Sequence, residues 1–329
     1  MVISISSTPP AVDAEKLTAH VKFLSVEVHP RTADHFANLQ RAAEYIFAQL
    51  KSTSADGSYQ DLLVDGRKYK NIIARYGPKS GALMVIGAHY DAHGHVDPIP
   101  ARSVHTLGAD DNASDVAGLI QLAKLLHQNQ PNRSVELLAY TLKEPPFFRM
   151  SDTGSAYHAR ALAAQNPSVD LMISPETIGD FSDQPNSQDY PVRGLSALYA
   201  DTRNFITIVG KLSHFNATRK VKPLMRGATD LPIFSINALP LLTGIDFSDH
   251  LNYWAHDMPA LMISDTAFMR NKHYHLAGDT YDKLDYVRMA KLVQGGMQWW
   301  RGIERKQSLA STFTIIMRRV IVVYNNPTF

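Results

Sequence analysis

Short apolar runs alternate with helical patterns along this chain, and this alternation constrains the fold more than any other feature. The runs that we expect to be strands are 82–87, 135–142, 171–174, 205–209 and 260–264. Runs this short and this uniformly apolar are typical of strands buried on both faces of a sheet. The segments with apolar residues at helical spacing are 16–28, 33–50, 113–128, 153–164 and 284–300. Strands that alternate with helices predict an α/β fold, a three-layer α/β/α sandwich around a mixed, largely parallel central sheet.

The 329 residues contain no internal repeat and no low-complexity linker, so we expect a single domain over 1–329. Residues 1–14 are expected to be flexible. The polar, proline-containing stretch 180–204 reads as a long surface loop, and long loops in compact domains are often functional.

The chain has no cysteine and 14 histidines. Disulfides, iron–sulfur clusters and a cysteine nucleophile are therefore excluded, and any metal must be bound by nitrogen and oxygen. The formal net charge of +2 argues against a nucleic-acid partner. We see no signal peptide and no apolar stretch long enough to span a membrane. A cytoplasmic location is expected by default, or a periplasmic or secreted one if a signal has already been removed.

Acids and histidines follow the expected strands, where ligands collect in open α/β sheets. His89 and Asp91 follow the first run and point the same way if extended, which suits a metal-binding imidazole oriented by a carboxylate. Glu144, Glu176 and His275 follow later runs. Each of these residues alone is equally well explained as an ordinary solvated strand end. Together they indicate a site.

A further pair of acids, Asp110 and Asp111, directly precedes the 113–128 helix. One acid there is explained as a helix cap, so Asp110 is the acid in excess and is free to bridge two ions. Two histidines and three carboxylates suit a pair of divalent ions, two Zn²⁺ first of all, with Mn²⁺ or Co²⁺ as alternatives. Two-metal sites of this kind serve hydrolysis.

The motifs GAHYDAHG, GADDNAS, KEPPFF, PETIGDFSD, SDH and HYHLAGDT occur in this order. They resemble the co-catalytic di-zinc aminopeptidases of the bacterial leucyl aminopeptidase and aminopeptidase Y type, which are related to glutamate carboxypeptidase and glutaminyl cyclase. The resemblance covers about residues 15–300 and leaves 311–329 outside. It implies a zinc exopeptidase-like fold and a metallo-aminopeptidase. A bridging metal-bound hydroxide would hydrolyse the N-terminal bond of a peptide or aminoacyl substrate.

The resemblance also implies a role for each site residue. His89 and Glu144 would bind one zinc, and Glu176 and His275 the other. Asp110 would bridge both, with a cis peptide bond to Asp111. The remaining implied residues are Asp91, which would orient His89 and contribute to catalysis, and Asp249 and His250, which would lie near the substrate.

Lys143 is the main departure from the family pattern, because active relatives have a glutamate at this position. That glutamate accepts a proton from the bridging water and passes it to the leaving amine, which an ammonium cannot do. We therefore expect a metal site of native layout with impaired hydrolysis. The alternatives are a non-catalytic homologue that binds metal or a partner on a peptidase scaffold and, third, a glutaminyl cyclase-like acyltransferase. The motifs make no prediction about the oligomeric state.

Overall fold

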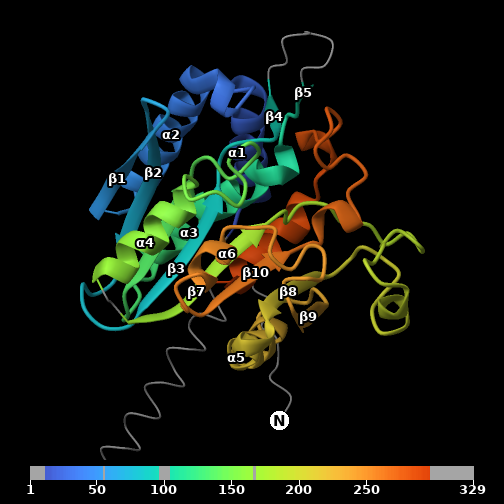
Figure 1. Cartoon of the computed structure of the whole chain (residues 1–329). Helices are drawn as coiled ribbons and strands as arrows, with labels where there is room; N and C mark the ends of the chain where they lie inside the picture. The colour runs from blue at the N-terminus through green and yellow to red at the C-terminus, as the bar shows by residue number, and fades with distance from the viewer. Residues whose placement is uncertain (1–11, 55, 96–103, 166–167, 297–329) are drawn as a thin grey trace, which may run out of the picture.

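The structure, a computed structural model, describes residues 12–54, 56–95, 104–165 and 168–296 (Figure 1). The expectations for the tail 311–329, for 1–11 and for the last four residues of the 284–300 helix fall outside these residues. Within the described part of the chain, no helix is long and apolar enough to cross a membrane.

A central sheet of eight strands runs through the molecule in the order β1-β2-β6-β3-β7-β10-β8-β9. The strands are β1 (Asp56–Val64), β2 (Arg67–Tyr76), β3 (Leu83–His89), β6 (Val135–Tyr140), β7 (Val169–Glu176), β8 (Ile206–Lys211), β9 (Ile233–Ala238) and β10 (Ala260–Ser264). The four central strands, β6, β3, β7 and β10, are parallel. Strands β1, β2 and β8 join their neighbours in antiparallel pairs, and β9 pairs with β8 in parallel. The carboxyl ends of the central strands therefore meet at one edge.

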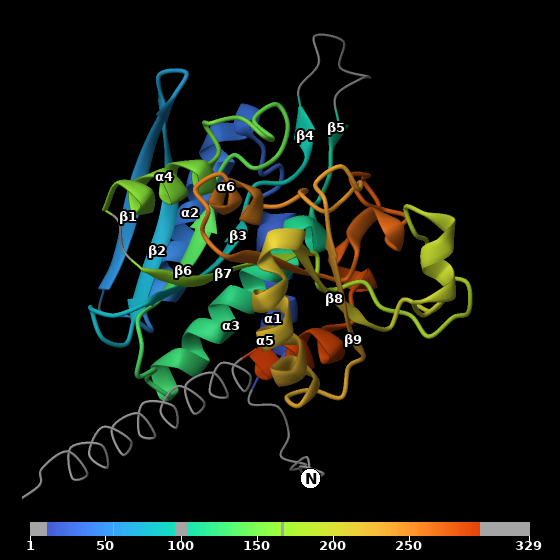
Figure 2. The ribbon, with the colours of Figure 1, turned by 60° about the horizontal axis from the view of Figure 1, so that its bottom comes forward.

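Helices cover both faces of this sheet (Figures 1 and 2). One face carries α1 (Ala14–Lys22), α2 (Phe36–Lys51), α3 (Asp115–Gln128), α5 (Phe215–Arg226) and the helix over 286–296, and the other carries α4 (Gly154–Gln165) and α6 (His250–Trp254). Successive residues of β6 enter different cores, because Leu137 belongs to the larger apolar cluster and Leu138 to the smaller one. This alternation is the period of two of a strand buried on both faces. The predicted three-layer α/β sandwich is confirmed.

All five predicted strands are strands of the sheet, but three of its members were missed. Strands β1 and β2 form an antiparallel pair at one edge, and β9 lies at the other edge. These strands are partly exposed and carry polar residues, so they contain no continuous apolar run. A small hairpin of β4 (Gly94–His95) and β5 (Val104–His105) was missed as well. The 180–204 stretch is a loop whose only regular element is a 3-10 turn at Arg193–Ala197.

Candidate metal centre

Titratable side chains converge at the carboxyl edge of the four parallel strands. His89 is the last residue of β3, and Glu176 is the last residue of β7. Glu144 lies beyond the end of β6, where Pro145 and Pro146 follow it and prevent further strand pairing. His275 comes from the turns after β10. His89, Glu144 and Glu176 are each at most 3% exposed, so their charges interact with little screening.

The side chain of Asp91 lies beside His89, as the sequence predicted. His89 Nδ1 is 3.1 Å from the Asp91 carbonyl oxygen and 3.3 Å from Asp91 Oδ1. Asp91 Oδ2 accepts a hydrogen bond of 2.9 Å from the backbone N–H of Glu144. These contacts fix the imidazole through Nδ1, and His89 Nε2 remains available to the centre.

The residue that reaches both histidines is Asp111, which corrects the prediction of Asp110. Asp111 Oδ1 is 3.3 Å from His89 Nε2, and Asp111 Oδ2 is 2.9 Å from His275 Nε2. The carboxylate of Asp110 instead accepts hydrogen bonds of 2.8 Å from the Gly179 N–H and 3.1 Å from the side chain of Asn271.

The physical reason for this correction is the backbone of the segment Ala109–Ser114. It forms a short π-helical turn in which Asp111 and Asn112 have non-helical φ and ψ angles. An ordinary helix start, as assumed from the sequence, would have made Asp111 the cap and left Asp110 free. The cis peptide bond is likewise between Asp111 and Asn112 and not between the two aspartates.

The pairing of acids with histidines also differs from the expected one. Glu176 Oε2 is 3.5 Å from His89 Nε2, and Glu144 Oε2 is 3.5 Å from His275 Nε2. Glu144 extends across the centre as well, because His89, Asp111 and Glu144 offer ligand atoms within 4.8 Å of one another. The sequence indicates which residues follow a strand, but not the order of the strands or the direction of each side chain.

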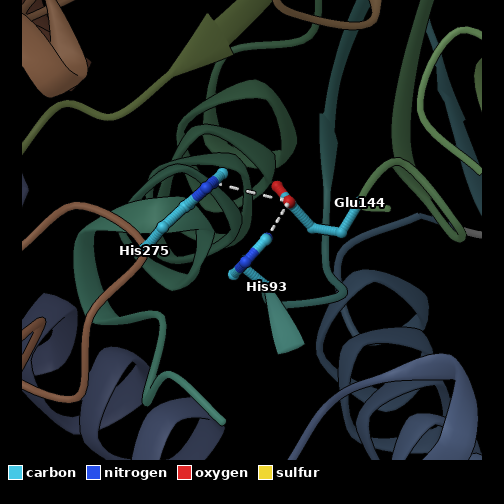
Figure 3. A group of neighbouring side chains, drawn as sticks. All are labelled: His93, Glu144 and His275. Carbon is cyan, nitrogen blue, oxygen red and sulfur yellow. Dashed lines mark hydrogen bonds and ion pairs between the residues drawn. The ribbon is translucent and has the colours of Figure 1, made fainter. Parts of the chain in front are cut away.

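His93 belongs to the centre although sequence reasoning missed it. Its Nδ1 atom is 3.2 Å from Glu144 Oε2, and its ring is stacked on the His275 ring with 3.9 Å between centroids and 6° between planes. Figure 3 shows both imidazoles directed at the same carboxylate. One donor atom from each of His93, Glu144 and His275 lies within 4.8 Å of the others. The available signal was the second histidine of GAHYDAHG, four residues after His89.

Lys143 points into the middle of the centre. Its Nζ atom donates to Glu144 Oε1 at 3.0 Å and to Glu176 Oε1 at 2.8 Å, and it lies 4.0 Å from Asp111 Oδ1. Burial opposes the charge, but the carboxylates of Glu144, Glu176 and Asp111 raise the pKa of Lys143 well above its usual value. The side chain is therefore an ammonium ion and cannot accept a proton.

Acids and bases of the centre shift one another's pKa values. Burial alone would lower the pKa of His275, but its contacts with Asp111 and Glu144 raise that pKa to about 9. Burial would also raise the pKa of Glu144, yet Lys143 and the neighbouring histidines hold it well below its usual value. Carboxylates that remain ionised while buried in this way need cations close by.

Buried atoms without a hydrogen-bond partner show where a cation fits. His89 Nε2, both carboxylate oxygens of Asp111, and His275 Nε2 are buried and make no well-aligned hydrogen bond within the described residues, although His275 Nε2 lies 2.9 Å and His89 Nε2 3.3 Å from Asp111. Such atoms are rare in folded proteins, because leaving a buried polar group unpaired costs about 1–3 kcal/mol. Imidazole nitrogen and carboxylate oxygen are the donors that zinc takes in proteins without cysteine ligands. The residues present therefore fit a divalent metal ion.

Asp249 and His250, which the resemblance places near the substrate, make no hydrogen bond to the predicted metal ligands in the described part of the chain, and their nearness to a substrate stays a prediction. His250 Nε2 is 2.8 Å from the carbonyl oxygen of Ile245, and its ring packs against Trp254 with the centroids 4.4 Å apart. Asp249 is buried, and burial raises its pKa to about 7. Their neighbour Ser248 reaches the centre instead, because its Oγ atom donates to Glu176 Oε2 at 2.7 Å.

An apolar pocket opens beside Glu176. Its empty volume is about 800 Å³, including the open mouth. Apolar side chains that line it include Phe205, Val209, Leu242, Phe247 and Met262. The 188–199 part of the long loop forms another wall, so the stretch that the sequence marked as a surface excursion borders the centre.

Comparison with known proteins identifies the family. The model for peptidase family M28 matches residues 71–295. The chain belongs to peptidase family M28. The uncharacterised protein YfbL of Escherichia coli (strain K12) is 49% identical to this M28 protein over 294 residues, which cover 89% of this chain and 90% of that protein.

Solved structures share the fold at low sequence identity. A leucine aminopeptidase precursor from Bacteroides thetaiotaomicron superposes with a TM-score of 0.64 at 20% identity, covering 88% of this chain and 97% of that one. A Zn-dependent exopeptidase from Parabacteroides distasonis superposes with a TM-score of 0.62 at 18% identity, covering 89% and 99%. This M28 protein is therefore built on a zinc-exopeptidase-type scaffold.

Proposed function

We propose that this M28 protein is a zinc-dependent aminopeptidase, which hydrolyses the N-terminal bond of a peptide or aminoacyl substrate. One observation carries the proposal. Metal-ligand atoms of His89, Asp111 and His275 that make no well-aligned hydrogen bond face one another, with Glu144 beside them and with Glu176 in the wall of an apolar pocket. Zinc bound there would polarise the scissile carbonyl group and lower the pKa of water.

The residues of this chain divide the remaining work. Asp111 directs one carboxylate oxygen to His89 and the other to His275, and so connects these two histidines. Asp91 fixes the orientation of His89 through Nδ1. Two Zn²⁺ are predicted from the sequence, and Lys143 determines whether a second ion binds beside the first.

The apolar pocket supports a preference for substrates with a large apolar N-terminal side chain. Its wall is built from aliphatic and aromatic residues, and it opens beside the carboxylate of Glu176. Burying a leucine or phenylalanine side chain in such a pocket contributes about 1.5–3 kcal/mol relative to leaving it in water. A short or charged side chain would gain little there.

Lys143 limits the rate in this proposal. Its ammonium group lies between Glu144 and Glu176, where the family pattern has a proton-accepting glutamate. General acid–base assistance is worth about 10²–10⁴-fold. We therefore propose slow hydrolysis by the natural chain, with a rate that rises when the base is restored.

Release of p-nitroaniline from leucine-p-nitroanilide in the presence of ZnCl₂ tests the proposal. We expect slow turnover by the natural chain and a rise of about 10²-fold or more for Lys143→Glu. Lys143→Gln removes the ammonium without supplying a base and should gain much less. Lys16→Glu, the same substitution at an exposed position of α1 outside the pocket lining, is the matched control. No hydrolysis of any aminoacyl-p-nitroanilide by the natural chain or by Lys143→Glu would overturn the proposal.

A second candidate function is a non-catalytic homologue that binds metal or a partner on the same scaffold. The observation that favours it is the Lys143 ammonium group, which is hydrogen-bonded to both Glu144 and Glu176. Zinc binding without turnover, and without recovery in Lys143→Glu, would support this candidate over the aminopeptidase.

A further inference from the structure

The two halves of the metal centre are not equivalent. Asp111 Oδ1 faces His89, which lies beside Glu176, and Asp111 Oδ2 faces His275, which lies beside Glu144. We call these the His89 half and the His275 half. The contacts that surround the two glutamates show which half is open to a metal ion.

In the His89 half, the carboxylate of Glu176 already has partners at both oxygens. Lys143 Nζ donates to Oε1 at 2.8 Å, and Ser248 Oγ donates to Oε2 at 2.7 Å. The same ammonium group lies 4.0 Å from Asp111 Oδ1, the oxygen that faces His89. The ammonium group of Lys143 therefore already provides a positive charge beside Glu176 and Asp111 in this half.

In the His275 half, Lys143 Nζ donates to Glu144 Oε1 at 3.0 Å, and the contacts of Glu144 Oε2 with the described residues are with imidazoles. Glu144 Oε2 is 3.2 Å from His93 Nδ1 and 3.5 Å from His275 Nε2 (Figure 3). Asp111 Oδ2 adds a fourth donor, 2.9 Å from His275 Nε2. The atoms of His93, Glu144 and His275 lie within 4.8 Å of one another, and with Asp111 they give the two nitrogen and two oxygen donors that a tetrahedral zinc ion takes. His93 supplies the ligand that this half would otherwise lack.

The position of the ammonium group gives a second reason for one ion. Lys143 Nζ lies 2.8 Å from Glu176 Oε1, 3.0 Å from Glu144 Oε1 and 4.0 Å from Asp111 Oδ1, so its positive charge is already close to all three carboxylates. A second ion would lie within a few ångströms of both the first ion and the ammonium group, at a site with little water to screen the repulsion.

We propose that this chain binds one divalent ion of the zinc class in the His275 half, through His93, Glu144, His275 and Asp111. The ammonium group of Lys143 takes the place of a second ion beside His89 and Glu176. This proposal rests on the metal dependence of the proposed function, but it concerns the number of ions and their ligands rather than the reaction.

Zinc stoichiometry tests the proposal without any measurement of activity. The full chain is stripped with a chelator and titrated with ZnCl₂ by calorimetry, and its zinc content after dialysis is measured by mass spectrometry. We expect one ion per chain for the natural protein and for Lys143→Arg, and a second ion for Lys143→Met. Lys272→Met, which removes an exposed lysine, should leave the count at one.

The role of His93 is tested by a matched pair of histidine variants. His93→Gln should weaken zinc binding at least tenfold, whereas His95→Gln, a change two residues along and exposed, should leave it unchanged. Thermal unfolding of each metal-free variant shows whether it is folded, and only folded variants enter the comparison.

The outcomes separate this proposal from the proposed function. Two tightly bound ions in the natural protein, or an unchanged count in folded Lys143→Met, would overturn the Lys143 proposal and leave a metal-dependent hydrolase standing. Equal zinc affinity of folded His93→Gln and His95→Gln would overturn the ligand role of His93. Failure of the natural protein to bind zinc at all would overturn the proposed function as well.

Discussion

Asparagine substitutions at two adjacent aspartates distinguish the residue that binds the metal ion from the residue that holds the surrounding structure in place. Asp111 directs its two oxygens to His275 Nε2 at 2.9 Å and His89 Nε2 at 3.3 Å. Asp110, one residue earlier, directs its oxygens to Gly179 and Asn271. Both aspartates are at most 2% exposed, so the two variants differ in the direction of the carboxylate and not in burial.

The expected magnitudes follow from these contacts. Four-ligand zinc sites bind with about 10–16 kcal/mol in total, or roughly 2.5–4 kcal/mol per ligand. Removing the Asp111 charge should therefore weaken zinc binding about 10²–10³-fold, at about 1.4 kcal/mol per tenfold. Burial and the neighbouring Asp265 and Asp279 raise the pKa of Asp110 well above its usual value, and its two oxygens accept hydrogen bonds from Gly179 and Asn271 rather than facing a histidine of the centre. Asp110→Asn should cost about 1 kcal/mol of stability and little zinc affinity.

Calorimetric titration with ZnCl₂ measures both affinities, and urea unfolding of the metal-free proteins measures both stabilities. We expect a large loss of zinc affinity for Asp111→Asn and a small one for Asp110→Asn. The opposite order, with zinc binding lost in a folded Asp110→Asn variant and kept in Asp111→Asn, would refute the assignment of Asp111 as a metal ligand.

Three further predictions concern stability, pH and substrate choice. Arg31 is fully buried and donates to four backbone carbonyl groups around the centre. In urea unfolding, Arg31→Met should lower the free energy of unfolding by at least ~3 kcal/mol, and the exposed control Arg41→Met by less than ~0.5 kcal/mol. Burial lowers the pKa of His20 to about 4. Between about pH 6.5 and 4, the unfolded chain therefore binds a proton that the folded chain does not, and the free energy of unfolding should fall by up to ~3 kcal/mol as the pH falls through that window. Urea titrations of His20→Gln should lack most of this pH dependence. An unchanged pH dependence would contradict the role of His20. Because the pocket is apolar, Lys143→Glu should hydrolyse leucine-p-nitroanilide with a kcat/KM roughly 10- to 50-fold higher than that for alanine-p-nitroanilide, at about 0.8 kcal/mol per added carbon. A preference for alanine or aspartate would contradict the role of the pocket.

The parts of the fold that the sequence predicts are those buried on two faces. Strands β3, β6, β7 and β10 form the middle of the sheet, and their runs are apolar because helices cover both sides. Strand β1, with sequence DGSYQDLLV, is largely half-exposed at the sheet edge, so polar residues interrupt its pattern. Hydrophobic periodicity reports burial, and an edge strand with little burial leaves a weak signal.

The site residues that could be predicted from the sequence are those at the ends of strands. His89 and Glu176 end their strands, and the parallel arrangement brings both to one edge. The choice between Asp110 and Asp111 depends on backbone angles in a π turn, which no spacing of residue types encodes. His93 was missed because it lies in a loop beyond β3, where the direction of a side chain is set by tertiary packing.

Anomalous scattering from a crystal grown with ZnCl₂, recorded at the zinc absorption edge, tests the metal centre most directly. The account predicts a peak within bonding distance of His275 Nε2, Asp111 Oδ2 and Glu144 Oε2, at about 2.0–2.2 Å from each donor. Ordered side chains at these positions without a zinc peak between them, at saturating ZnCl₂, would contradict the claim that this centre is built to bind metal.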